Sequence, residues 1–431
     1  MSELKRHMGL FHLTMYGVGL ILGAGIYVLI GEAAGFAGNS VWISFILGSI
    51  VALFAGLSFA ELSSIFPKVA AEYIFVKNAF KNNFFAFIIG WLTAITAMIT
   101  AATVALGFGG YLAQFVNLPI TISAILLIGI LSVVNFIGIK ESSWANIVFT
   151  IIEAAGLILI IVIGFTISSP EPVNYFESPT GLSGIIVAFV LSFFAFIGFE
   201  AMSNVAEEVR NPKKTIPRAI FLSVVISSLL YVLLAFAVFR VINWEDFSSS
   251  SAPLAEVVRI RLGAQGQIIL TGIALFAITN TVLITLIAGS RIMFGMARDK
   301  SFPILLTKIH SKTKTPWIAI IAIMIVAIGF SLIGDIVIVA NIAVFAVVIT
   351  FAAVILSLIV LRYTQPNIER GFKIPINIGK FPVLPVLGLV ILGYMMLQFE
   401  MEVMFVGLAI ISAGAIFYVI FKKRNNFSNS S

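Results

Sequence analysis

Long apolar runs separated by short polar stretches make up almost the whole of this 431-residue chain. Twelve runs are each long enough to cross a hydrocarbon core, which takes about 20 helical residues. Helices satisfy their own backbone groups, and the runs are too long and too continuously apolar for the strands of a barrel. The predicted transmembrane helices are 11–36, 40–65, 84–116, 119–139, 143–168, 184–207, 217–241, 264–290, 315–334, 336–361, 383–399 and 402–421.

Basic residues fall on alternate loops of this threading. When the N-terminus is placed inside, all but three of the 26 Lys and Arg residues lie on the inner side, and Arg240, Arg259 and Arg261 are left outside. Basic loops stay in the cytoplasm during membrane insertion. We therefore predict a multi-pass protein of the cell (plasma) membrane with both termini cytoplasmic. The net charge of +7 then indicates loops that face anionic lipid, and no nucleic-acid partner is expected.

Composition excludes several functional classes. The chain is 60% hydrophobic and 10% charged, whereas a soluble domain is about 25% charged. It has no cysteine and three histidines, which excludes disulfides and thiolate metal sites. The sequence shows no catalytic constellation and no phosphate-binding loop. We expect a single transmembrane domain over 1–431, with no catalytic residues, no metal site and no cofactor.

Two of the predicted helices carry glycines that favour an interruption. The first contains Gly17, Gly19, Gly23 and Gly25 within nine residues, and the sixth contains Gly198. Glycine inside a helix costs about 1 kcal/mol relative to alanine, so this density indicates a use. Paired interrupted helices in the two halves of a transporter point to its binding site. The alternative is an unbroken helix that uses glycine for close packing.

Four sequence blocks occur in order along the chain. They are Gly-Val-Gly-Leu-Ile-Leu-Gly-Ala-Gly-Ile-Tyr (17–27), Phe-Ala-Glu-Leu-Ser-Ser-Ile-Phe-Pro (59–67), Phe-Phe-Ala-Phe-Ile-Gly-Phe-Glu (193–200) and Met-Ala-Arg-Asp (296–299). Together they resemble motifs of the amino acid–polyamine–organocation transporters. The resemblance implies a leucine-transporter-type fold of two inverted five-helix repeats, 11–168 and 184–361, followed by two accessory helices over 383–421. It also implies amino acids or related amines as substrates.

A substrate site follows from the interrupted helices. The N-terminal end of the outer half of the first helix would offer backbone N–H groups to a carboxylate, and glycine lets the ligand approach. Carbonyl groups freed at Ile21 and at Phe194, Ala195 and Ile197 would accept hydrogen bonds from the ammonium group. By similarity to the family these are the recognition positions, with Phe194 at its aromatic gate. The predicted substrate-binding residues are Ile21, Gly23, Ala24, Gly25, Ile26, Phe194, Ala195, Phe196 and Ile197.

Glu153 is the sharpest single candidate for coupling. It lies near the middle of the fifth predicted helix, with Asn146, Thr150 and Gly156 on the same helical face. A charged carboxylate facing lipid there costs a few kcal/mol, so the side chain should face the bundle. Desolvation favours the protonated acid, which suits a proton carrier.

Three interpretations of Glu153 remain open. In proton-coupled relatives a lysine commonly occupies the matching position, so an acid here departs from the family pattern. The residue carries the coupling proton, or it ligates Na⁺ together with the Gly19 carbonyl, Asn280 and Thr281, because hard cations favour oxygen ligands. The third interpretation is a neutral acid that hydrogen-bonds a helix break.

Other acids divide between function and anchoring. Glu200 follows the sixth-helix interruption and is predicted either as a second titrating group or as a cap of the inner half-helix. Glu61 and Asp335 are expected to anchor helix ends, and Asp299 to form an ion pair in an inner loop.

The sequence therefore predicts proton-coupled symport of a neutral amino acid by alternating access. An amino acid/amine exchanger and a Na⁺-coupled symporter are the alternatives within this class. A channel is the alternative from another class, although channels usually place filters on re-entrant loops or charge rings of oligomers. The expected partners are an amino acid, a coupling ion (H⁺ or Na⁺) and the lipid bilayer. The oligomeric state is not predicted.

Overall fold

The computed structural model describes residues 8–68, 70–138, 143–166 and 172–428. The predicted inner-loop residues Lys5, Arg6 and Lys140, and the predicted end of the fifth helix at 167–168, lie outside the described residues.

The described chain is helical, as the apolar pattern predicts. Within it, nine helical stretches are long and apolar enough to cross a membrane, and the first of them, Leu10–Ile65, contains three separate helices. Trp317–Ser331 and Val383–Met396 are shorter apolar helices. Each of the twelve predicted segments falls on one or more helices. The number of membrane crossings and the inverted repeat remain predictions.

The helices follow one another with short connections. In chain order they are α1 (Leu10–Leu22), α2 (Ala24–Ala37), η1 (Gly38–Ser40), α3 (Val41–Ile65), α4 (Ala71–Phe80), α5 (Asn83–Leu112), α6 (Ile120–Ile137), α7 (Ser143–Thr166), α8 (Leu182–Ser192), η2 (Phe193–Phe196), α9 (Ala201–Asn204), η3 (Ala206–Glu208), α10 (Pro212–Val238), α11 (Trp244–Ser249), α12 (Pro253–Arg298), η4 (Ile304–Thr307), α13 (Trp317–Ser331), α14 (Ile336–Thr364), α15 (Val383–Met396) and α16 (Met401–Ser428).

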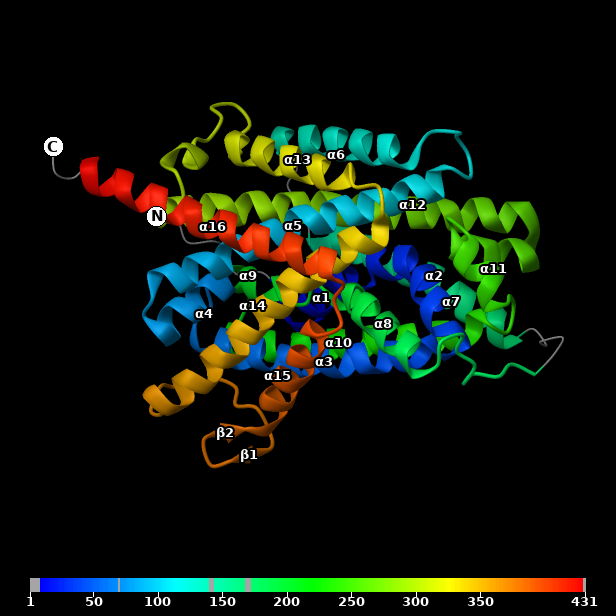
Figure 1. The fold of residues 1–431 in the computed structure, drawn as a ribbon, viewed down its shortest axis with the longest axis horizontal. Coiled ribbons are helices and arrows are strands. Elements are labelled where there is room, and N and C mark those ends of the chain that lie inside the picture. Colours follow the sequence, from blue (N-terminus) through cyan, green and yellow to red (C-terminus); the bar gives the residue numbers. More distant parts are fainter. Residues whose placement is uncertain (1–7, 69, 139–142, 167–171, 429–431) are drawn as a thin grey trace.

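Several long helices, including α5, α6 and α12, run along the horizontal direction of Figure 1. Helix α5 lies inside the bundle, where it packs against α12, α14, α6 and α13, while α10 packs against α3, α1 and α7. The short helix α4 and the last turns of α16 lie toward one end of the molecule, and α11 lies at the opposite end (Figure 1). We call these the α4 end and the α11 end.

Helix α12 spans 46 residues and is interrupted by a kink at Gly263, whose φ of +68° and ψ of −166° are not helical. The segment before the kink, 253–262, is a short helix of its own. Only glycine adopts this backbone conformation readily. The kink therefore separates a short helix at the α11 end from the long helix that enters the bundle.

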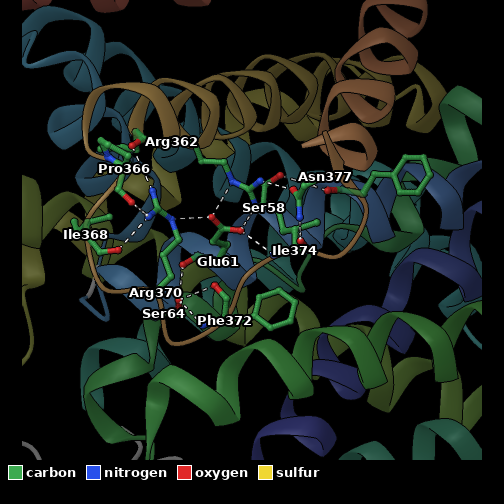
Figure 2. A network of polar contacts seen from close by, with 12 residues as sticks. Ser58, Glu61, Ser64, Arg362, Pro366, Ile368, Arg370, Phe372, Ile374 and Asn377 are labelled. Atoms are coloured by element: carbon green, nitrogen blue, oxygen red, sulfur yellow. Dashed lines mark hydrogen bonds and ion pairs between the residues drawn. The ribbon is translucent and has the colours of Figure 1, made fainter. Parts of the chain in front are cut away.

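The loop between α14 and α15 contains a short hairpin, so the fold is not wholly helical. Strand β1 (Asn377–Ile378) pairs antiparallel with β2 (Phe381–Pro382). The loop is held by Glu61 of α3, which is fully buried (Figure 2). Glu61 Oε1 accepts hydrogen bonds from Arg362 Nε at 3.0 Å and Arg370 Nε at 3.1 Å, and Oε2 accepts from the Ile374 backbone N–H at 2.9 Å. The predicted anchoring role of Glu61 is confirmed.

Two other predicted anchors are also present. Asp335 caps α14, because its Oδ1 accepts the N–H groups of Val337 and Ile338 at 2.8 and 3.0 Å. Asp299 forms its ion pair with Lys77 of α4, whose Nζ lies 2.9 Å from Oδ2. This pair connects α4 to the end of α12.

Candidate functional site

The first predicted interruption is present in the structure. Helix α1 ends at Leu22 and α2 begins at Ala24, and Gly23 between them has φ −39° and ψ −150°, outside the helical range. The Gly23 N–H donates to the Gly19 carbonyl at 3.0 Å. A side chain at Gly23 would overlap the Thr281 hydroxyl of α12. The close approach of α12 therefore requires glycine at the break.

The sixth predicted helix is interrupted as well. Helix α8 ends at Ser192 and continues as the 3₁₀ turn η2, after which Ile197 is extended, with φ −63° and ψ 134°. Gly198 has φ +129°, a conformation that L side chains rarely adopt. A Cβ atom on Gly198 would lie 3.0 Å from the carbonyl oxygen of Leu20 in α1. The glycine thus allows this segment to approach the first helix.

The two interruptions lie against each other. A Cβ atom on Gly25, in the first turn of α2, would lie 2.8 Å from Ala195 Cα in η2. Gly25 and Ala195 are both buried. Contacts on Leu20 and on Gly25 therefore place η2 and the residues that follow it beside both halves of the first helix.

The residues predicted to bind the carboxylate occupy the start of α2. Ala24, Gly25 and Ile26 are buried, and the first amides of a helix have no partner within it. The Ala24 N–H donates to Thr281 Oγ1 at 3.1 Å. The arrangement presents a helix N-terminus, which carries partial positive charge, at the break.

Three of the carbonyl groups predicted to receive the ammonium group already accept a hydrogen bond from the protein. The Tyr231 hydroxyl contacts both breaks, and its single proton is shared between the carbonyl oxygens of Ile21 and Ala195, the latter at 3.0 Å. The Phe194 carbonyl accepts the Ile197 N–H at 3.1 Å. A protein donor therefore uses one lone pair of each of these carbonyl oxygens, and an ammonium group would take the second lone pair or displace the donor, so their role in substrate binding stays a prediction.

Tyr231 of α10 was missed by the sequence reasoning. It is fully buried, and the ring of Phe196, itself one of the predicted site residues, lies edge-on to it at 5.2 Å. The available signal was a hydroxyl in the middle of the predicted helix 217–241. Such a group must find an acceptor, because lipid offers none.

Glu153 faces the bundle, as predicted, and is fully buried. Asn280 Nδ2 donates to Oε1 at 3.3 Å, whereas Oε2 has no hydrogen-bond partner among the described residues. The Tyr27 hydroxyl donates to the Glu153 backbone carbonyl at 2.7 Å. Thr150, one turn earlier, donates to the Met15 carbonyl of α1 at 3.1 Å. The carboxyl group thus lies between α1, α2 and α12.

The groups predicted as Na⁺ ligands are brought only partly together. Asn280 contacts Glu153. The Gly19 carbonyl accepts the Gly23 N–H, and Thr281 Oγ1 accepts the Ala24 N–H while donating to the Ala277 carbonyl at 3.0 Å. Both oxygens therefore already accept hydrogen bonds from backbone N–H groups at the helix break.

A cavity of about 170 Å³ extends from the interruptions toward α4. Of the predicted site residues, Ile197, Glu200 and Thr281 line it, and the remaining predicted site residues are not part of its lining. Glu200 Oε2 accepts, at 2.9 Å, the N–H of Gly198, which precedes α9, and the Glu200 side chain makes no capping hydrogen bond to α9, so the predicted cap of the inner half-helix is not formed. The lining also includes residues that the sequence reasoning did not assign to a site, namely Tyr16, Leu20, Glu72, Thr93, Thr96, Ala97, Thr100, Ile284, Thr285, Arg291, Thr350 and Phe351.

A sequence signal for part of this lining exists. Thr93, Thr96 and Thr100 recur at helical spacing on one face of an otherwise apolar segment. In the structure this face of α5 borders the cavity.

Comparisons with known proteins find a matching family and related transporters. The family described as "Amino acid permease" matches residues 8–422. The sequence is 31% identical over 456 residues to the branched-chain amino acid permease BcaP of Bacillus subtilis (strain 168), covering 99% of this chain and 95% of that protein. It is 28% identical to the methylthioribose transporter of the same organism, covering 99% and 96%. It is 29% identical to the mouse (Mus musculus) cationic amino acid transporter 4, covering 85% and 61%.

Proposed function

The chain belongs to the amino acid permease family, and from this premise we propose that it is a secondary active transporter that carries amino acids across the cell membrane by alternating access. It is a multi-pass membrane protein, and no enzymatic activity is assigned to it. The observation that carries the proposal is the contact between two interrupted helices inside an apolar bundle. Paired broken helices at mid-membrane are where transporters of this kind bind their cargo.

We propose a topology of twelve crossings with both termini cytoplasmic. The first inverted repeat spans 11–168, the second spans 184–361, and two accessory helices follow over 383–421. The distribution of basic residues supports this orientation. The α4 end, where α16 also finishes, would then be the cytoplasmic end (Figure 1).

The substrate would bind at the two breaks. Its carboxylate would lie on the first amides of α2, which carry partial positive charge. Its ammonium group would lie near the carbonyls of Ile21 and Ala195 and take the place that the Tyr231 hydroxyl now occupies. A neutral, apolar side chain is favoured because the residues around the break are mostly apolar. The similarity to a branched-chain amino acid permease supports the same substrate class.

Glu153 would carry the coupling proton. Its carboxyl group is buried beside the break and has one oxygen without a partner among the described residues. A protonated acid is far less costly to hold in this position than a carboxylate, so the group can lose its proton only when the site is hydrated. The Na⁺ alternative is less well supported, because Gly19 and Thr281 use their oxygens within the protein.

The test is uptake of a radiolabelled amino-acid panel into proteoliposomes, with pH and Na⁺ gradients imposed separately. We expect a pH gradient to drive accumulation of branched-chain amino acids in the wild-type protein. Glu153→Gln should abolish uphill accumulation while substrate binding stays measurable. Glu369→Gln, at an exposed position, is the matched control and should behave as the wild type.

Three results would count against this assignment. Undiminished proton-driven accumulation in Glu153→Gln would remove the residue from coupling. Accumulation driven by Na⁺ alone would favour the cation alternative. Rapid counterflow without any net gradient-driven uptake would identify an exchanger.

A further inference from the structure

The cavity between the interruptions and α4 is lined by charged groups that belong neither to the proposed substrate site at the helix breaks nor to the proposed coupling residue, Glu153. Glu72 of α4, Glu200 before α9 and Arg291 of α12 all line it. Opposite charges around one cavity of about 170 Å³ match a small ligand that carries both charges.

Glu72 has a buried carboxyl oxygen that is available to a ligand in the cavity. Its side chain is 1% exposed, and its Oε1 has no hydrogen-bond partner within the described part of the chain. Burial, with a smaller contribution from the nearby charge of Glu200, raises the pKa of Glu72 to about 7, while its own backbone N–H and Asn204 oppose the shift. Glu72 lies in α4, outside the membrane-spanning helices. It is therefore partly ionised near neutral pH.

Few charged or titratable groups face Glu72 among the described residues that line the cavity. Glu200 before α9, Arg291 of α12 and Tyr16 of α1 line the cavity, and on α4 itself Tyr73 and Lys77 are bonded to Asp299. Helices α5 and α14, which pack against α4, contribute threonine, alanine and apolar side chains to the lining.

Hydroxyl groups on the facing wall provide a second indication of a polar ligand. Thr96 and Thr100 of α5 are 8% and 9% exposed and line the cavity. Neither hydroxyl oxygen has a hydrogen-bond partner among the described residues. Buried polar groups are almost always paired in folded proteins, so two orphans and an orphaned carboxylate oxygen around one cavity indicate an occupant that bonds to them.

We propose that this cavity is a release site, in which an amino acid leaving the helix breaks holds its ammonium group on Glu72 and Glu200 and its carboxylate on Arg291 and the threonine hydroxyls before it enters the cytoplasm. This inference rests on the proposed transport function. The physical need is clear. A zwitterion that leaves the backbone amides loses the groups that compensate its charges, and neither charge can cross an apolar passage alone.

The site makes affinity at the inner face depend on pH. Because the pKa of Glu72 is raised to about 7, the carboxylate is mostly charged at pH 8 and mostly neutral at pH 6. The ammonium group is attracted to the charged form. Inner-face affinity is therefore highest at pH 8 and falls as the pH is lowered through 7.

The experiment compares the two faces. Inside-out and right-side-out vesicles from cells that express each variant are assayed for KM of labelled leucine at pH 6 and pH 8, with vesicles from cells lacking the protein as background. In the wild type we expect a lower inner-face KM at pH 8 than at pH 6. Glu72→Gln should raise the inner-face KM at pH 8 on the order of tenfold, as expected for loss of a charge-assisted hydrogen bond, and should remove the pH difference. The outer-face KM should change less than twofold.

Further variants separate a ligand contact from a structural role. Glu72→Asp should restore part of the pH dependence, and Glu369→Gln should leave both faces unchanged. The double variant Thr96→Val/Thr100→Val keeps shape but removes the orphan hydroxyls, and it should raise the inner-face KM several-fold. It decides the question if Glu72→Gln fails to reach the membrane.

The outcomes are distinguishable. The release site would be overturned, with transport left intact, if Glu72→Gln shows the wild-type inner-face KM and pH profile. If Glu72→Gln is not produced, the same result in the threonine double variant would overturn it. Equal changes at both faces would also overturn it. An effect of Glu72→Gln on labelled lysine but not on leucine would show that the acids bind a side chain instead. Absence of transport of any amino acid by the wild type would overturn the proposed function itself.

Discussion

Neutralising Glu61 should destabilise the protein far more than neutralising an exposed acid. Glu61 is fully buried between Arg362, which is 3% exposed, and Arg370, which is 11% exposed (Figure 2). Glu61→Gln keeps the side-chain size but leaves two guanidinium groups in the interior without a counter-charge. Removing one partner of a buried ion pair costs about 3–5 kcal/mol, most of it the penalty of the charge left behind.

The expected loss can be measured by thermal unfolding in detergent, followed by tryptophan fluorescence. A change of 1 kcal/mol shifts Tm by about 2–4 °C in chains of 150–250 residues, and the shift per kcal/mol is smaller in longer chains. At about 2.1 cal/mol/K per residue, the unfolding entropy of 431 residues is about 0.9 kcal/mol/K, so we expect Tm of Glu61→Gln to fall by about 3–6 °C. Glu369→Gln is the matched control, since Glu369 pairs with Lys213 on the surface, where the two side chains are 84% and 46% exposed. An exposed pair contributes about 0–1 kcal/mol.

A double-mutant comparison tests the mechanism as well as the magnitude. Arg362→Gln alone leaves Glu61 with one remaining arginine and also removes the bond to Asn377. In Glu61→Gln/Arg362→Gln the loss should be smaller than the sum of the two single losses, because each single variant strands a charge that the double variant removes. The reasoning would be refuted by a Tm for Glu61→Gln equal to that of Glu369→Gln, or by strictly additive losses.

Two further predictions concern the helix breaks. Gly25→Val should weaken equilibrium binding of labelled leucine at least about tenfold, because a Cβ atom 2.8 Å from the Ala195 backbone forces the breaks apart. Gly272→Val, at a glycine with open space around it, is the control. Normal affinity in Gly25→Val would contradict binding of the substrate carboxylate at the first amides of α2. Tyr231→Phe should lower the free energy of unfolding by about 1–3 kcal/mol, because the buried carbonyls of Ile21 and Ala195 lose their donor. Added leucine should raise the Tm of Tyr231→Phe by more than it raises the Tm of the wild type. If Tyr231→Phe has the wild-type Tm without leucine, the bridging role of the hydroxyl is contradicted.

The apolar pattern was sufficient to locate the helices and the two breaks. Hydrophobicity acts on each segment by itself, so the length of a run predicts a helix whatever packs against it. A glycine cluster is equally local, because backbone freedom belongs to the residue. Gly23 and Gly198 mark breaks in the structure, and Glu153 faces the bundle because no other direction lets a carboxyl group avoid lipid.

The partners across the bundle were decided only by the tertiary structure. The Tyr231 hydroxyl occupies the carbonyls of Ile21 and Ala195, which are 210 and 36 positions away in the chain. The cavity extends from the breaks toward α4, because Glu72 lines it from α4 while the threonines line it from α5. A sequence specifies which groups must find a partner in a medium without water. Which groups they meet depends on the rotation and depth of helices packed side by side, and those are set by the packing of all the helices together.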